Sequence, residues 1–198
     1  MTEVGSLYQS HAGRYDAQRD RSLMEKEHLK ALCGRLREGA RVLDLGCGAA
    51  EPIAQYFIEQ GYALTGVDIA PAMILLCRRR FPEQQWLEGD MRSIDLAEQF
   101  DAVVAWDSMF HLTADEQRAL IPRIAKRMAP NGLFMFTSGT RFGSSIGTLC
   151  GSDLYHASLD TREYERRLAD EGFLVLAHTV EDPACGFHTV WLAQMASR

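Results

Sequence analysis

The stretch Val42-Leu43-Asp44-Leu45-Gly46-Cys47-Gly48-Ala49-Ala50 is an apolar run that breaks into a glycine turn. A second apolar run, at 63–67, is closed by Asp68, twenty residues after Gly48. A strand, a glycine turn, a helix and an acid at the end of the next strand form a crevice for a nucleoside. The glycines let the backbone approach the ligand, and the acid accepts hydrogen bonds from ribose hydroxyls.

The same turn narrows the choice of nucleoside ligand. In the dinucleotide fingerprint G-x-G-x-x-G, Gly46 and Gly48 fit the first two glycines, but Glu51 stands at the third. A carboxylate there would repel a pyrophosphate placed on the helix N-terminus. No Gly-Lys-Ser/Thr phosphate loop follows. The sequence therefore indicates a nucleoside without phosphates, which points to S-adenosylmethionine.

At these residues the chain resembles the class I S-adenosylmethionine-dependent methyltransferases. Asp68 matches the family's ribose-binding acid, and Asp90 with the amide of Met91 matches its adenine-reading pair. Five of the family's motifs occur in the family's order, at 44–48, 66–69, 88–91, 100–107 and 128–136. Ala50 stands where a third glycine is common in the first motif.

The resemblance implies a Rossmann-like α/β fold and a binding site for S-adenosylmethionine as cofactor. The fold would be a doubly wound, mostly parallel seven-stranded sheet with an antiparallel last strand, helices on both faces and an N-terminal helical cap. The residues expected to bind the cofactor are Tyr15, Asp44, Gly46, Cys47, Gly48, Asp68, Ile69, Met73, Asp90, Met91 and Trp106.

Several of these residues have structural alternatives. Asp44 could satisfy loop amides at a strand end, and Asp90 could serve its Gly-Asp turn. Trp106 could shield the sulfonium with its π face or cover the sheet edge. His111 is the candidate catalytic residue, as a general base with a pKa near neutrality. Its alternative is an ordinary hydrogen-bonded histidine.

Apolar periodicity predicts how the chain is organised. Apolar runs alternate with helical stretches, so a parallel sheet is expected, with strands at about 41–45, 64–68, 85–88, 101–106 and 133–138. Two further runs, 173–180 and 188–195, are joined by a turn too short for a parallel crossover, so they should pair antiparallel.

One domain covering residues 1–198 is predicted, with two parts that could close the site. The first is a helical cap at 1–38, in which Tyr8, His11 and Tyr15 share a helical face and Glu38-Gly39 ends the second helix. The second is a glycine-rich substrate loop at 139–160, whose glycines permit mobility. The tyrosines could instead pack on the core, and the loop could be a plain connection.

The composition of the chain limits the classes of partner that it is expected to bind. The 198 residues are 46% hydrophobic and carry a net charge of −6, which argues against a nucleic-acid partner. The five cysteines are scattered without C-x-x-C spacing, and no metal-ligand cluster is evident. Neither a signal peptide nor a membrane-spanning apolar run is recognisable. A cytoplasmic protein acting on a small molecule is expected.

Three functions remain open at this point. The first is methyl transfer from S-adenosylmethionine to a small-molecule acceptor by in-line displacement, which requires alignment and exclusion of water more than acid–base help. The second is binding of S-adenosylmethionine without transfer, as a sensor or inactive partner. The third is a nucleotide-dependent oxidoreductase on a related fold.

Overall fold

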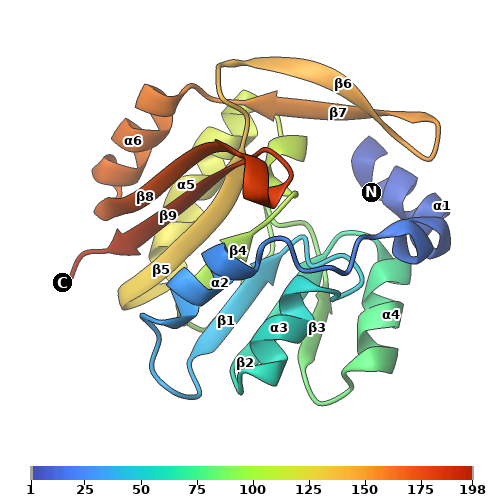
Figure 1. The fold of residues 1–198 in the computed structure, drawn as a ribbon, viewed down its shortest axis with the longest axis horizontal. Coiled ribbons are helices and arrows are strands. Elements are labelled where there is room, and N and C mark those ends of the chain that lie inside the picture. The colour runs from blue at the N-terminus through green and yellow to red at the C-terminus, as the bar shows by residue number, and fades with distance from the viewer. Residues whose placement is uncertain (1, 198) are drawn as a thin grey trace.

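The computed structural model describes residues 2–197, and Figure 1 shows their arrangement around one large sheet. The strands of this sheet are β1 (Arg41–Leu45), β2 (Ala63–Asp68), β3 (Gln85–Glu88), β4 (Phe100–Ala105), β5 (Met128–Ser138), β8 (Phe173–Asp182) and β9 (His188–Met195). The helices are α1 (Glu3–Gln18), α2 (Lys26–Cys33), α3 (Ile53–Glu59), α4 (Pro71–Arg80), α5 (Ala114–Arg127) and α6 (Thr161–Asp170). Short 3-10 turns lie at η1 (Met109–His111) and η2 (Pro183–Cys185), and β6 (Gly143–Leu149) and β7 (Ser152–Ser158) form a separate hairpin.

The sheet has the order β3-β2-β1-β4-β5-β9-β8. Strands β1 to β5 run parallel, whereas β9 is antiparallel to both of its neighbours, β5 and β8. This confirms the predicted fold class. The strand order reverses between β1 and β4, and in such sheets ligands bind beyond the carboxyl ends of the strands at that point.

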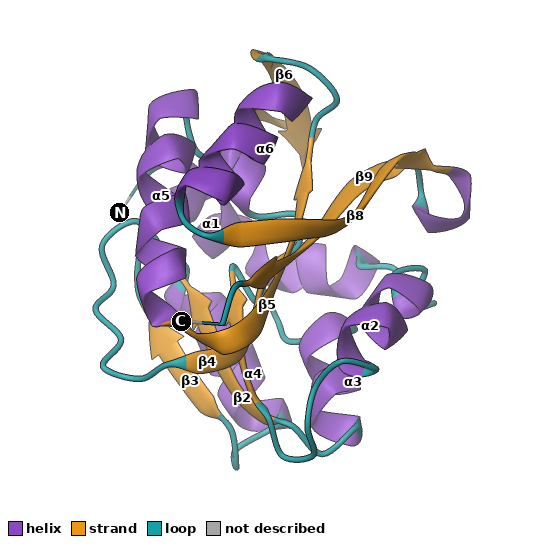
Figure 2. Cartoon of the chain, turned by 90° about the vertical axis from the view of Figure 1, so that its left-hand side faces the viewer, coloured by secondary structure: helices purple, strands orange, loops and turns teal. Residues whose placement is uncertain are grey.

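Helices cover both faces of the sheet, as Figure 2 shows. On one face Leu120 and Ile124 of α5 join Leu168 of α6 in a buried cluster with β4 and β5. On the other face Leu29 of α2 and Phe57 of α3 pack with β1 and β2. Full burial of such a side chain stabilises the fold by about 1.5–3 kcal/mol, so these two clusters hold the strand ends in place.

Local sequence signals set the helix ends. Pro71 occupies the first turn of α4, where its missing N–H leaves no hydrogen bond unmade. Thr113 and Glu116 form a reciprocal capping box at the start of α5. Asp160 accepts a hydrogen bond from the Glu163 amide at the start of α6.

Two predicted segments differ from the structure. The second helix ends at Cys33, not at Glu38-Gly39, because the amide of Gly34 caps it and residues 34–40 turn back into β1. Residues 143–158 of the predicted loop form the β6–β7 hairpin. Its two-residue turn, Cys150-Gly151, has positive φ at both positions (53° and 91°), the geometry that favours tight hairpins.

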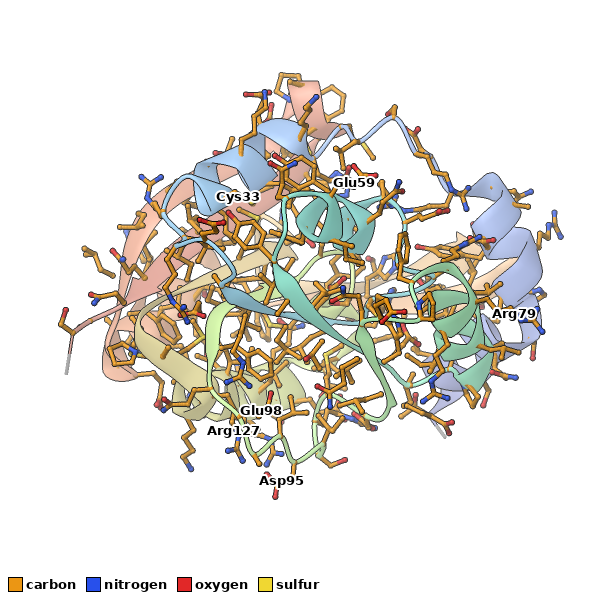
Figure 3. All side chains as sticks on the ribbon, turned by 90° about the horizontal axis from the view of Figure 1, so that it is seen from below. Cys33, Glu59, Arg79, Asp95, Glu98 and Arg127 are labelled. Atoms are coloured by element: carbon orange, nitrogen blue, oxygen red, sulfur yellow. The ribbon has the colours of Figure 1, made fainter. Side chains whose placement is uncertain are left out.

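The amino ends of the strands face away from the reversal point and carry surface charges. Figure 3 labels Asp95, Glu98 and Arg127 there, and Arg127 Nη2 lies 2.5 Å from Asp95 Oδ1. Glu98 pairs with Arg41 at the start of β1. Across residues 2–197, no helix is both long and apolar enough to cross a bilayer.

Candidate active site

A cavity of about 410 Å³ opens at the carboxyl ends of β1, β2 and β4, beneath α1. We call it the larger cavity. Its volume is within the range of small-molecule sites. It is lined by every residue predicted from the sequence for the site except one: Tyr15, Asp44, Gly46, Cys47, Gly48, Asp68, Ile69, Asp90, Met91, Trp106 and His111. Binding of a cofactor by these residues stays a prediction.

The exception is Met73. Its side chain is fully buried in a small cluster with Ala12, Ala49 and Ala70, which fastens α4 to α1 and to the glycine turn. Met73 does not line the larger cavity, so the predicted contact with the cofactor lacks support. Its side chain faces α1 because this face of α4 is apolar.

The glycine turn brings the backbone to the cavity wall. Gly46 has φ +79°, and a Cβ added there would lie 2.3 Å from Cβ of Ser108. The amides of Gly46 and Cys47 both donate to the carbonyl of Val67, at 2.8 and 3.0 Å. Ala50 adopts φ +72°, a left-handed conformation, which explains why glycine is common at this motif position.

Asp68 connects the turn to the second strand. Its Oδ2 accepts from the Gly48 amide at 3.0 Å, and its Oδ1 accepts from the Ala70 amide at 2.8 Å. Burial nevertheless raises the pKa of Asp68 to about 6, against the opposing effect of these hydrogen bonds. Each oxygen retains a lone pair for a further donor such as a ribose hydroxyl.

Asp44 is more deeply buried, with 3% of its surface exposed. Burial first, and the negative charge of Asp68 second, raise the pKa of Asp44 to about 7. Within residues 2–197 no side-chain or backbone donor is hydrogen-bonded to its carboxylate. Two carboxylates with raised pKa values thus face one cavity without a counterion, an arrangement that a bound cation would relieve.

Asp90 is already held by a partner that sequence reasoning missed. Arg92 Nε lies 2.9 Å from Asp90 Oδ1 and 3.0 Å from Oδ2, and this contact lowers the pKa of Asp90. Arg92 also pairs with Glu116 of α5. Asp90 therefore presents to the cavity a carboxylate whose charge is compensated, with capacity to accept one further N–H.

The charge of Glu51 is also compensated. Its Oε2 lies 2.7 Å from Arg21 Nε and 3.6 Å from Arg80 Nη1, and Arg80 binds Asp16 of α1 at 2.6 Å. The repulsion of a pyrophosphate by Glu51, expected from the sequence, is therefore weaker than predicted. Asp44 and Asp68 instead disfavour a phosphate ligand, because their uncompensated carboxylates face the same cavity and would repel its negative charge.

The N-terminal cap consists of α1 alone, because Leu29 and Leu32 of α2 pack on the sheet. Tyr8 and Tyr15 of α1 both line the larger cavity, with their rings edge to face at 5.4 Å. Figure 1 shows α1 beside the end of the β6–β7 hairpin, so both predicted closing elements lie on the same side of the site.

His111 lines the cavity, but its surroundings argue against a general base. Its Nδ1 donates to the carbonyl of Tyr155 at 3.1 Å, so the lone pair on Nε2 accepts from the Tyr8 hydroxyl, also at 3.1 Å. Burial lowers the pKa of His111 to about 4. The imidazole is therefore neutral, and its basic nitrogen is occupied by a phenol.

A second cavity of about 330 Å³, the smaller cavity, adjoins the first between η1, the end of β5, β7 and the turn into β9. Tyr8, Tyr15, Asp107 and His111 line both cavities. Of these four residues, which form the boundary between the cavities, Asp107 pairs with His188, whose Nε2 lies 2.9 Å from Asp107 Oδ1. Sequence reasoning missed His188, since it begins β9, 81 residues after Asp107, and carried no local signal.

The known proteins that this chain is similar to include several methyltransferases. A family model described as a methyltransferase domain matches residues 42–132. The dTDP-4-amino-2,3,4,6-tetradeoxy-D-glucose N,N-dimethyltransferase of Saccharopolyspora spinosa is 31% identical over 142 residues, covering 67% of this chain and 56% of the relative. A malonyl-(acyl-carrier protein) O-methyltransferase of Enterobacter lignolyticus is 30% identical over 118 residues, covering 58% and 46%. The chain spans about half the length of the curated relatives it matches.

Solved structures share the fold at low sequence identity. An amino pentose methyltransferase from Micromonospora echinaspora, solved with bound S-adenosylmethionine, has a TM-score of 0.72 and 19% identity, covering 94% of this chain and 96% of its own. A 1,6-didemethyltoxoflavin-N1-methyltransferase from Burkholderia thailandensis, solved with S-adenosylhomocysteine, has a TM-score of 0.71 and 22% identity, covering 97% and 88%.

Proposed function

The chain belongs to the class I S-adenosylmethionine-dependent methyltransferases, and from this premise we propose that it transfers a methyl group from S-adenosylmethionine to a small molecule. The donor occupies the larger cavity, and the acceptor occupies the smaller one. The acceptor is small because the smaller cavity holds about 330 Å³.

The observation that carries this proposal is the pair of carboxylates at the glycine turn. Asp44 and Asp68 both have raised pKa values because they are buried without a counterion. An amino acid ammonium would compensate one carboxylate, and ribose hydroxyls would donate to the other. A dinucleotide would bring additional negative charge to the same wall.

The other residues of the site position and protect the reactants. The bound donor supplies a methyl group on a sulfonium sulfur, a leaving group good enough that alignment matters more than proton transfer. Tyr8 and Tyr15 cover the mouth and exclude water. Asp107, just after the end of β4, lines both cavities and stands where the two ligands would meet, and Trp106 beside it lines the larger cavity.

Calorimetry and product analysis test the proposal together. Titrating S-adenosylmethionine, S-adenosylhomocysteine and NADH into the purified protein should show binding of the first two only. Methyl-labelled donor, incubated with a small-metabolite extract, should yield labelled low-mass products, which mass spectrometry would identify. NADH binding with an empty donor site would refute the proposal. Tight donor binding without any labelled product would favour a sensor or inactive partner.

A further inference from the structure

Asp107 occupies a special position at the end of β4. Its backbone has φ +47°, in the left-handed region that few residues other than glycine, asparagine and aspartate adopt. Its amide donates to Thr137 Oγ1 of β5 at 2.9 Å, which fixes this conformation. Strained backbone of this kind often marks functional sites. Here it places a carboxylate on the wall shared by the two cavities.

His188 fixes the orientation of that carboxylate. Its Nδ1 donates to the carbonyl of Cys185 at 2.6 Å, and its Nε2 lies 2.9 Å from Asp107 Oδ1 and 3.1 Å from Oδ2. Both ring nitrogens face acceptors, so both carry protons and the imidazole is a cation. The carboxylate accordingly raises the pKa of His188. Oδ1 also meets the Thr137 hydroxyl at 3.4 Å, whereas Oδ2 keeps acceptor capacity.

The rest of the smaller cavity provides little for an anion. Among the described residues that line it, none is a lysine or an arginine. His111 is neutral, and burial lowers the pKa of His156. The one cationic side chain, His188, is already paired. Aromatic rings, including Phe110 and the 70%-exposed Phe187, complete the wall, and such rings attract cations by their π faces.

We propose that the smaller cavity binds an amine and that Asp107 Oδ2 is the atom that accepts its N–H. His188 is a positioning residue that holds Asp107 and moderates its charge. The inference deepens the proposed function by naming the acceptor class as an amine. It disfavours carboxylate acceptors and acceptors with a phosphate close to the nitrogen, because neither would find an unpaired cation.

Three matched probes test the proposal at pH 7.5: cyclohexylamine, cyclohexanol and cyclohexanecarboxylate. Each is titrated into the full chain, with and without saturating S-adenosylhomocysteine, and binding is read from the imidazole NMR signals of His188. Because these signals report on the smaller cavity, the titration does not depend on a filled larger cavity. The amine should bind about tenfold or more tightly than the other two, as expected for one charge-assisted hydrogen bond.

Two variants should change amine binding in opposite directions. Asp107→Asn keeps the left-handed backbone, since asparagine tolerates it, and should lower cyclohexylamine affinity about tenfold or more. Its signals remain readable because His188 is retained. His188→Gln leaves Asp107 as an uncompensated anion, so amine affinity, followed by saturation-transfer NMR on the probe, should rise severalfold. A fall in amine affinity in His188→Gln would overturn the role of His188 in moderating the charge of Asp107.

The outcomes separate this inference from the proposed function. Equal binding of the three probes, a preference for the carboxylate, no binding of the amine, or an unchanged affinity in Asp107→Asn would overturn the inference. Amine binding that depends on Asp107, in a protein that neither binds S-adenosylmethionine nor yields labelled product, would instead overturn the proposed function and leave the amine site standing.

Discussion

Replacing Asp44 by asparagine should stabilise the ligand-free protein and weaken its affinity for the donor. The pKa of Asp44 rises from an ordinary value of 3.8 to about 7 in the folded chain. A gap of about three pH units corresponds to about 4 kcal/mol, by which the buried charge destabilises the fold above pH 7. Leaving an asparagine amide buried without partners costs about 1–3 kcal/mol. The net gain is therefore about 2 kcal/mol.

The stabilisation expected from Asp44→Asn depends on pH, because Asp44 titrates at different pH values in the folded and unfolded chains. Because the folded pKa lies above the unfolded one, the folded state binds more protons. The contribution of Asp44 to stability therefore falls as the pH rises from about 4 to about 7 and is constant above that. At pH 5 the Asp44 carboxyl is protonated in the folded protein but mostly ionised in the unfolded chain, and this difference destabilises the unmodified fold by about 1.6 kcal/mol. The unpartnered asparagine amide destabilises the variant by a similar amount, so the two proteins should be equally stable at this pH.

Thermal unfolding of the ligand-free proteins measures the effect. At pH 8 the Asp44→Asn variant should melt roughly 4–8 °C above the unmodified chain, from about 2–4 °C per kcal/mol at this size. At pH 5 the two should melt together. Calorimetry at pH 8 should show S-adenosylmethionine affinity lowered about 10–100-fold, through loss of a charge-assisted hydrogen bond. Equal melting temperatures at both pH values, or unchanged donor affinity, would refute the reasoning.

Other substitutions test the turn and the helices. Asp68→Ala should weaken donor binding by about 1–3 kcal/mol by stranding hydrogen-bond donors; calorimetry giving unchanged affinity in the folded variant would contradict the assignment. Gly46→Ala should destabilise by more than about 2 kcal/mol in urea unfolding, given φ +79° and the 2.3 Å approach to Ser108. Its control, Gly13→Ala on an open face of α1, should stabilise by about 0.5–1 kcal/mol. Thr113→Ala removes the α5 capping box and should cost about 1 kcal/mol in the same assay, and no loss would count against that cap.

Some of the site could be predicted because its geometry is local. An apolar run, two glycines and a closing acid specify a strand, a turn and a strand end within 27 residues, from Val42 to Asp68. The capping box of Thr113 and the position of Pro71 also depend only on neighbouring residues. Where the turn chemistry of Cys150-Gly151 was overlooked, a hairpin was predicted as a loop.

The chain alone therefore determined the strand–turn–strand frame around the larger cavity, because strand and turn preferences act over a few residues. The tertiary structure alone decided which side chains meet at the smaller cavity. His188 reaches Asp107 because β9 inserts antiparallel between β5 and β8. Tyr8 reaches His111 because α1 packs over the carboxyl edge. Both contacts depend on how the whole sheet and its helices bury their apolar faces. The residues that meet are far apart in the sequence, so no motif of fixed spacing predicts that they touch.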